Sequence, residues 1–82
     1  MSRVGNRLAS YRAAHRLSWR QLGRQLGHSS TYVQDLARGR RRATVAAAQR
    51  YASLLGEDEE TWIVDALDDK LDAHGHHSPP GS

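Results

Sequence analysis

The chain has 82 residues, a length that suits one small domain with a modest hydrophobic core. It contains no cysteine, which excludes disulfide bonds and thiolate metal sites and is compatible with a reducing compartment. Its formal net charge is only +3, and no apolar run approaches the roughly 20 residues that cross a bilayer. Because nothing resembles a signal peptide either, we expect a cytoplasmic protein.

The small net charge hides two blocks of opposite sign. Residues 1–56 carry eleven arginines and one acid, Asp35, which gives a formal charge of +10. Residues 57–82 carry eight acids and one base, Lys70, which gives −7. Such an excess of arginine favours a polyanionic partner, most simply nucleic acid, over arginines that only solvate helix surfaces. The acidic block is compatible with an ordinary solvated helix, or with a device that keeps this end of the molecule away from phosphates.

Helical signals dominate from the start of the chain, and strand signals are almost absent. The first predicted helix spans residues 4–15. The second begins at Ser18, which can form a capping box with Gln21, and it ends before Gly27, a residue that readily adopts a left-handed backbone. Two predicted helices therefore follow each other closely in the first third of the chain, and the second has both a cap and a glycine stop.

Two more helices follow after short turns. Ser29 is a suitable N-cap for a third helix over residues 30–38, and Gly39 is its C-terminal stop. Thr44 caps a fourth helix, which ends before Gly56. Between these two helices lies a basic loop that contains three consecutive arginines.

The fifth predicted helix spans residues 58–73 and opens with acids that suit the positive end of the helix dipole. We therefore expect one domain over residues 1–73, whose acidic C-terminal helix lies within 57–73. Residues 74–82 contain two glycines, two prolines and no large apolar residue, so we expect a disordered tail. Its histidines lack carboxylate or thiolate help in a flexible segment, and we expect no metal site there.

The segment from Leu17 to Gly56 has the layout of a helix-turn-helix, in which the second helix of the motif enters the major groove. Its informative residues are Leu17-Ser18-Trp19-Arg20-Gln21-Leu22-Gly23, Leu26-Gly27-His28-Ser29, Tyr32-Val33, Leu36-Ala37-Arg38-Gly39, Thr44-Val45, Ala48, Tyr51-Ala52 and Leu55-Gly56. Together they resemble the Cro/Xre family of phage and bacterial repressors. The resemblance implies an all-α, compact five-helix, lambda-repressor-like fold and a repressor that binds operator DNA as a two-fold dimer.

The chain departs from the family pattern at three positions. Trp19 stands where the family usually has a glutamine that helps to hold a phosphate; its indole N–H could do the same, or its ring could extend the apolar stripe. Ala37 stands where a glutamate often pairs with the arginine that matches Arg12, so Arg12 lacks that partner and is free for a phosphate or another acid. Gly23 replaces the usual alanine, which still permits close helix approach at a cost in helix propensity of up to ~1 kcal/mol.

The third helix supplies the predicted base-reading residues. At 100° per residue its apolar side chains share one side, and the opposite side presents polar groups, with Ser30 at the first turn. By the family match and this arithmetic, the base-reading residues are Ser30, Thr31, Gln34 and Asp35. Gln34 could pair with adenine, Thr31 could contact a thymine methyl, and Asp35 could accept from a cytosine amino group. Pairing of Asp35 with an arginine such as Arg38 is an equally good interpretation.

The predicted phosphate contacts surround this helix. Their members are Trp19, Tyr32, Arg38, Arg40, Arg41, Arg42 and Thr44. The arginines lie in or beside the loop that runs along the DNA backbone in this fold, where they would supply sequence-independent affinity and a steep salt dependence. A merely solvated loop is the alternative. Thr44 adds the amino end of a helix, and Tyr32 could reach a phosphate with its hydroxyl or belong to the core.

The fifth helix is the predicted dimer interface. Its apolar side is larger than a small helical domain obviously needs, so part of it could close the core and the rest could meet a second copy. The predicted interface residues are Trp62, Ile63, Ala66, Leu67 and Leu71.

These observations favour a sequence-specific duplex DNA-binding regulator, most simply a nucleoid-associated homodimeric repressor that needs no cofactor. We expect no enzyme, because the sequence shows no phosphate-binding glycine loop, no cysteine and no Ser/His/Asp arrangement. Two alternatives stay open. One is an antitoxin-like or adaptor module that binds a partner protein through its acidic helix, and the other is a non-specific architectural DNA binder.

Overall fold

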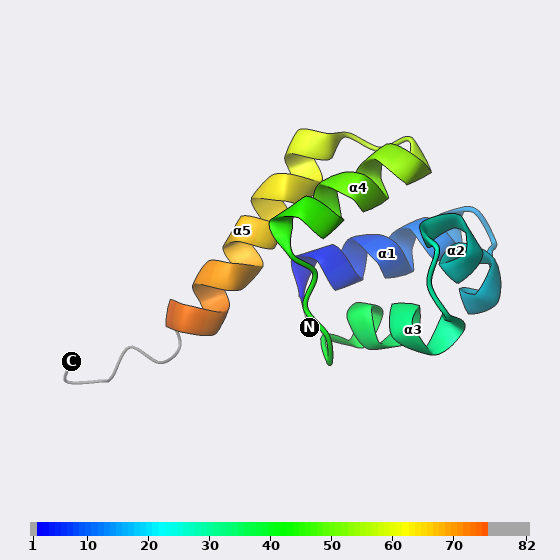
Figure 1. The fold of residues 1–82 in the computed structure, drawn as a ribbon, viewed down its shortest axis with the longest axis horizontal. Coiled ribbons are helices and arrows are strands. Elements are labelled where there is room, and N and C mark those ends of the chain that lie inside the picture. The colour runs from blue at the N-terminus through cyan, green and yellow to red at the C-terminus, as the bar shows by residue number, and fades with distance from the viewer. Residues whose placement is uncertain (1, 76–82) are drawn as a thin grey trace.

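The computed structural model describes residues 2–75, with side chains for residues 2–72, as a set of five helices (Figure 1). They are α1 (Arg3–Ala14), α2 (Trp19–Leu26), α3 (Ser30–Arg38), α4 (Val45–Leu55) and α5 (Glu59–Gly75). No strand occurs in this part of the chain, so the all-α prediction is confirmed. The bounds agree with the predicted ones to within two residues. α5 continues through Gly75, past the predicted start of the tail, and the rest of that tail lies outside the described residues.

Local caps begin and end the helices, as the sequence predicts. Ser18 and Gln21 form both halves of the capping box: the Ser18 amide donates to Gln21 Oε1 at 2.8 Å, and the Gln21 amide donates to Ser18 Oγ at 3.0 Å. Ser29 and Thr44 accept backbone N–H groups at the starts of α3 and α4. Left-handed glycines at the ends of α2, α3 and α4 complete the pattern. Ser29 and Gly39 thus fix where α3 starts and stops.

All five helices contribute to one apolar core, and α1 lies between α3 on one side and the α4–α5 pair on the other (Figure 1). The largest buried side chains are Trp62 of α5 and Tyr51 of α4, each 1% exposed. The start of α1 packs so closely on the end of α3 that a Cβ on Gly5 would lie 2.9 Å from the Ala37 carbonyl oxygen. α1 therefore acts as the support against which α3 is held.

The acids of α5 bind the start of α1 rather than merely facing water. Asp69 is 7% exposed, and its two carboxylate oxygens accept the backbone N–H groups of Arg3 and Val4 at 2.8 and 3.1 Å. Arg3 also pairs with Asp72, and Arg7 pairs with Asp65. Asp69 thus caps a helix 66 residues away in the sequence. None of the described helices is long and apolar enough to cross a membrane.

Candidate nucleic-acid interface

α3 carries the predicted base-reading residues on the side that faces away from the core. Val33, Leu36 and Ala37 point inward and are at most 4% exposed. On the other side of the helix, Thr31 is exposed. Three further residues there are partly exposed: Ser30, Gln34 and Asp35. The structure therefore gathers these four residues on one accessible side of a short helix. That they read bases stays a prediction.

Asp35 organises the end of α3 through its backbone, and its side chain takes no arginine partner. Its carbonyl oxygen accepts the N–H groups of Arg40 and Arg41 at 2.9 and 3.2 Å, which sets the path of the basic loop. The ion pairs among the described residues involve Arg3 and Arg7, and none involves Asp35. The predicted alternative, a pair between Asp35 and Arg38, is therefore not formed in this structure, and the carboxylate is left to face outward.

Arg41 is held in place by an aromatic stack. Its guanidinium carbon lies 4.5 Å from the centre of the Tyr32 ring, a cation–π contact. The other partner of Tyr32 is His28, with ring centres 4.2 Å apart. The Nε2 atom of His28 lies 2.9 Å from the hydroxyl oxygen of the buried Tyr51. Tyr32 therefore positions a loop arginine.

The environment sets the charge of this stack. Burial, with the neighbouring Tyr32 as a second cause, raises the pKa of Tyr51 to about 12, so its phenol stays protonated. Burial, and then the positive charge of Arg50, lower the pKa of His28 below its ordinary value of 6.5. At neutral pH the imidazole of His28 and the phenol of Tyr51 are therefore both uncharged. Tyr32 was predicted from the sequence as a site residue, whereas His28 and Tyr51 were not, although aromatic residues four apart at positions 28 and 32 were a usable signal.

The remaining loop arginines form the basic rim beside α3. Arg38, Arg40 and Arg42 are exposed, and no acid of the described chain pairs with them. Thr44, at the end of this loop, is exposed, and its hydroxyl oxygen accepts the Ala47 N–H at 3.0 Å. Its hydroxyl hydrogen can still be donated to an anion. The structure thus places Arg38 and Arg40 at the carboxyl end of α3, whereas Arg42 and Thr44 lie where the loop reaches α4, beside Ala66 and Lys70 of α5.

Arg12 and Trp19, two positions of departure from the Cro/Xre pattern, contact each other. The Arg12 guanidinium lies 4.6 Å from the centre of the Trp19 ring, and its Nη1 donates to the Leu17 carbonyl at 3.0 Å. Because Ala37 has no carboxylate to offer, the indole ring is the partner that this arginine finds. Trp19 is partly buried against the core, so packing is one of its roles. Phosphate binding by Trp19 stays a prediction.

Gly23 allows α2 to approach the turn that leads into α3. A Cβ at this position would lie 2.6 Å from the His28 carbonyl oxygen and 3.2 Å from that of Ser29. The alanine that is usual at this position would therefore require the backbone of the turn to shift. In this chain the glycine is a packing requirement, and not only a tolerated loss of helix propensity.

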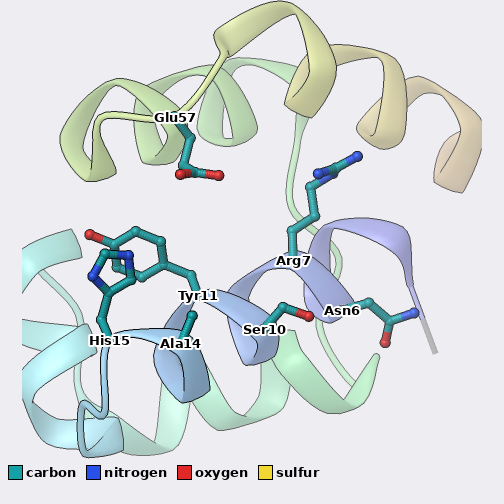
Figure 2. A pocket seen from close by; sticks show the side chains of 7 residues that line it. All are labelled: Asn6, Arg7, Ser10, Tyr11, Ala14, His15 and Glu57. Atoms are coloured by element: carbon teal, nitrogen blue, oxygen red, sulfur yellow. The ribbon is translucent and has the colours of Figure 1, made fainter.

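A groove on another side of the molecule lies between α1 and the connection from α4 to α5 (Figure 2). Figure 2 shows Glu57 reaching toward the stacked rings of Tyr11 and His15, while Arg7 extends toward α5, where it pairs with Asp65. Residues of both charge signs line this groove of about 290 Å³. Because it is not uniformly basic, it does not extend the cationic surface around α3.

The structure divides the predicted dimer residues into two groups. Trp62 and Ala66 are each 1% exposed, because they pack into the chain's own core. Their inclusion in an interface is therefore corrected: in this fold they cannot touch a second copy. Ile63 is partly exposed, whereas Leu67 and Leu71 are 44% and 67% exposed. Val64, which is 48% exposed on the same helix, was not among the predicted residues.

Comparison with known proteins agrees with this geometry. A family model described as Helix-turn-helix, of the Cro/C1 type, matches residues 8–62, about two thirds of the chain, and that range contains all of α2, α3 and α4. No curated protein and no solved structure matches the chain. The two helices of the motif, the glycine turn between them and the basic loop after them all lie inside the matched range. The chain therefore belongs to the Cro/C1-type helix-turn-helix family of DNA-binding regulators.

Proposed function

We propose that this protein represses transcription by binding an operator in duplex DNA, with α3 in the major groove. The observation that carries the proposal is the surface around α3. An outward polar side is joined directly to a loop of arginines for which the described chain supplies no acid. Polar side chains on a short exposed helix suit the edges of base pairs, and unpaired arginines suit phosphates.

The side chains of α3 divide the reading of the site among them. Gln34 offers an amide that pairs with adenine, Thr31 a methyl group for thymine, and Asp35 an acceptor for the cytosine amino group. Ser30, at the first turn, donates or accepts a single hydrogen bond. The outward carboxylate of Asp35 would repel phosphates, so it contributes discrimination between bases rather than affinity.

The arginine loop supplies affinity that does not depend on sequence. Arg41, held over Tyr32, enters the complex with part of its side-chain entropy already lost, so less is lost on binding. Neighbouring phosphates are contacted by Arg38 at the end of α3, by the loop arginines Arg40 and Arg42, and by the hydroxyl of Thr44. In the cell this surface would keep the protein on the nucleoid.

A homodimer through α5 completes the proposal. Leu67 and Leu71 lie four residues apart on α5, whose C-terminal part extends away from the other helices (Figure 1). A second copy would cover these side chains and place two recognition helices on one face of the DNA. Replacing both leucines by aspartate should give folded monomers with weak operator binding, whereas Ser53→Asp on α4 should not change the assembly. A dimer that survives the leucine changes in analytical ultracentrifugation would reject this interface.

The exposed apolar residues of α5 also favour a second candidate, a partner protein that docks there in place of a second copy. The discriminating observation is the assembly state of the purified chain. A stable homodimer leaves no free apolar surface at this site, whereas a monomer that sediments alone and binds DNA weakly would favour a partner from the same cell.

Selection of bound duplexes from a random pool at near-physiological salt tests the main proposal. Enrichment of an inverted repeat with half-sites about one helical turn apart is the expected result. Binding without enrichment would replace the operator-binding regulator with an architectural DNA binder. Failure of folded protein to bind any duplex would reject the DNA proposal.

Two variants test how α3 is docked. Thr31→Ala should alter sequence preference, while Arg41→Ala should weaken all sequences similarly and flatten the salt slope by about one unit. The reverse pattern would mean that a different surface faces the bases.

A further inference from the structure

The outer side of α2 carries two arginines for which the fold itself gives no reason. Arg20 and Arg24 are exposed, and they lie four residues apart, so their side chains share one side of the helix. Like charges at this spacing weaken a helix, and α2 contains no acid that would relieve them. No acid from another described helix pairs with them either. Among the described residues these two charges have no acidic partner, so they are available to a ligand from outside the chain.

These arginines border a hollow in the surface. The hollow has a volume of about 400 Å³ and is lined by Arg20, Arg24, His28, Ser29 and Ser30. No carboxylate lines it, and its side chains are cations or hydrogen-bonding groups. Two guanidinium groups offer several N–H donors in planar forks, the arrangement that matches a phosphate group. The chemistry of the hollow therefore suits a phosphate oxyanion.

The position of the hollow relates it to α3. Ser30 is the first residue of that helix, so the hollow lies at its amino end, whereas the loop arginines lie beyond its carboxyl end. The 9 residues of α3 separate the two basic sites by roughly 13 Å along its axis. That separation is close to the width of the B-DNA major groove, about 12 Å, whose borders are lines of phosphates.

We propose that Arg20 and Arg24 form a second phosphate clamp, which holds the DNA backbone at the amino end of α3 while the arginine loop holds it at the carboxyl end. This inference rests on the proposed DNA-binding function and adds residues that the sequence analysis did not include. With both ends of α3 held, the helix has one depth and one register in the groove. The clamp therefore contributes affinity to every sequence and accuracy to the reading of bases.

Salt dependence of binding tests the clamp in the full chain. The probe is the duplex enriched by selection, or a mixed-sequence duplex if none is enriched, and the variants are Arg20→Gln/Arg24→Gln and the matched control Arg16→Gln. Arg16 is also exposed, and it lies in the turn before α2, away from the hollow. Each lost phosphate contact should flatten the plot of log affinity against log salt by about 0.9, so the double variant should be shallower by about 1.8. Arg16→Gln should keep the wild-type slope.

Neutral methylphosphonate groups, placed one at a time in the duplex, identify the contacted phosphate. The wild-type protein should lose affinity at a backbone position that Arg20→Gln/Arg24→Gln no longer senses, while Arg41→Gln should still sense it. The loss of affinity in the wild-type protein depends only on the change in the DNA, so that part of the test does not rely on the folding of either variant. Free inorganic phosphate at the same concentration as the duplex should not compete, because the clamp binds the backbone in register with α3.

The results separate the clamp from the proposed function. A wild-type slope and methylphosphonate pattern in Arg20→Gln/Arg24→Gln would overturn the clamp and leave DNA binding by α3 and the loop intact. Loss of slope in Arg16→Gln equal to that of each clamp arginine would also overturn it, because the effect would then be general charge. Absence of DNA binding by the wild-type protein would overturn both proposals.

Discussion

Two arginines of α1, Arg3 and Arg7, and the arginines around α3 are the same residue type in opposite surroundings. Arg3 and Arg7 face a row of aspartates on α5, and Asp69 also caps the helix that carries them. The arginines of α2 and of the loop after α3 have no acidic partner in the described chain. The first group is occupied in holding the fold together, and the second is the group that we propose binds DNA. Count and sign of charge alone do not identify a binding surface, because internal partners decide which charges are free.

The largest expected effect is on stability, from Asp69, which holds the start of the helix that carries the paired arginines Arg3 and Arg7. Its carboxylate is buried and accepts two backbone N–H groups, so Asp69→Ala should lower the free energy of unfolding by about 3 kcal/mol through lost charge-assisted bonds and unsatisfied donors. Urea unfolding followed by circular dichroism measures this. Asp68→Ala is the matched control, because Asp68 is half-exposed and approaches Arg3 only at 4.0 Å. Equal losses for the two variants would mean that general acidity of α5, and not the cap, stabilises α1.

Gly23 tests whether close packing of α2 on the turn before α3 holds the region that carries the unpaired arginines. Gly23→Ala should destabilise the fold by roughly 1–2 kcal/mol, because overpacking against the His28 carbonyl exceeds the gain in helix propensity. Thermal unfolding gives the comparison with Gln25→Ala, an exposed change on the same helix that should be nearly neutral. A stabilised Gly23→Ala protein would show that the turn relaxes easily and does not fix α3.

Removal of the Tyr32 ring tests whether this ring orders Arg41 for DNA binding. Removing its ring by Tyr32→Leu should weaken DNA binding by about 0.5–1 kcal/mol, because Arg41 loses the platform that orders it. The same change in an Arg41→Ala background should cost little, and a double-mutant cycle of binding constants measures the difference. Additive losses would mean that Tyr32 contacts DNA by itself.

His28 gives the smallest expected effect, which depends on pH. Burial holds its pKa in the folded state below the ordinary value of 6.5, so the unfolded chain binds the proton more readily. Its contribution to stability is therefore complete above pH 6.5 and declines as the pH falls below that value toward the folded-state pKa. His28→Gln should remove this decline from the stability–pH curve. An unchanged curve would mean that protonation of His28 is not coupled to folding.

The helices of this protein were predictable because local signals set them. Ser18, Ser29 and Thr44 cap helices through residues three positions away, and Gly27 and Gly39 end helices through their own backbone angles. The polar outer side of α3 followed from the helical period. Local rules of this kind require no knowledge of the rest of the fold.

The partners of the charged side chains were not predictable in the same way. Asp69 lies 66 residues from the amide that it caps, and nothing in its neighbourhood indicates that contact. Trp62 was predicted to lie in an interface because apolar spacing on α5 does not reveal which side α1 and α4 cover. Arg12 and Trp19 illustrate the same point on a smaller scale, since their contact depends on how α1 and α2 are placed in space.

The most direct test of this division compares two double variants that remove equal charge. Arg41→Gln/Arg42→Gln removes two arginines that have no acidic partner among the described residues. Arg3→Gln/Arg7→Gln removes the two arginines that pair with aspartates of α5. Measured as the salt dependence of binding to one duplex, the first should flatten the slope by about 1.8, and the second should leave it unchanged while it lowers thermal stability. Equal changes of slope in the two variants would contradict the account, because both groups of arginines would then serve the DNA alike.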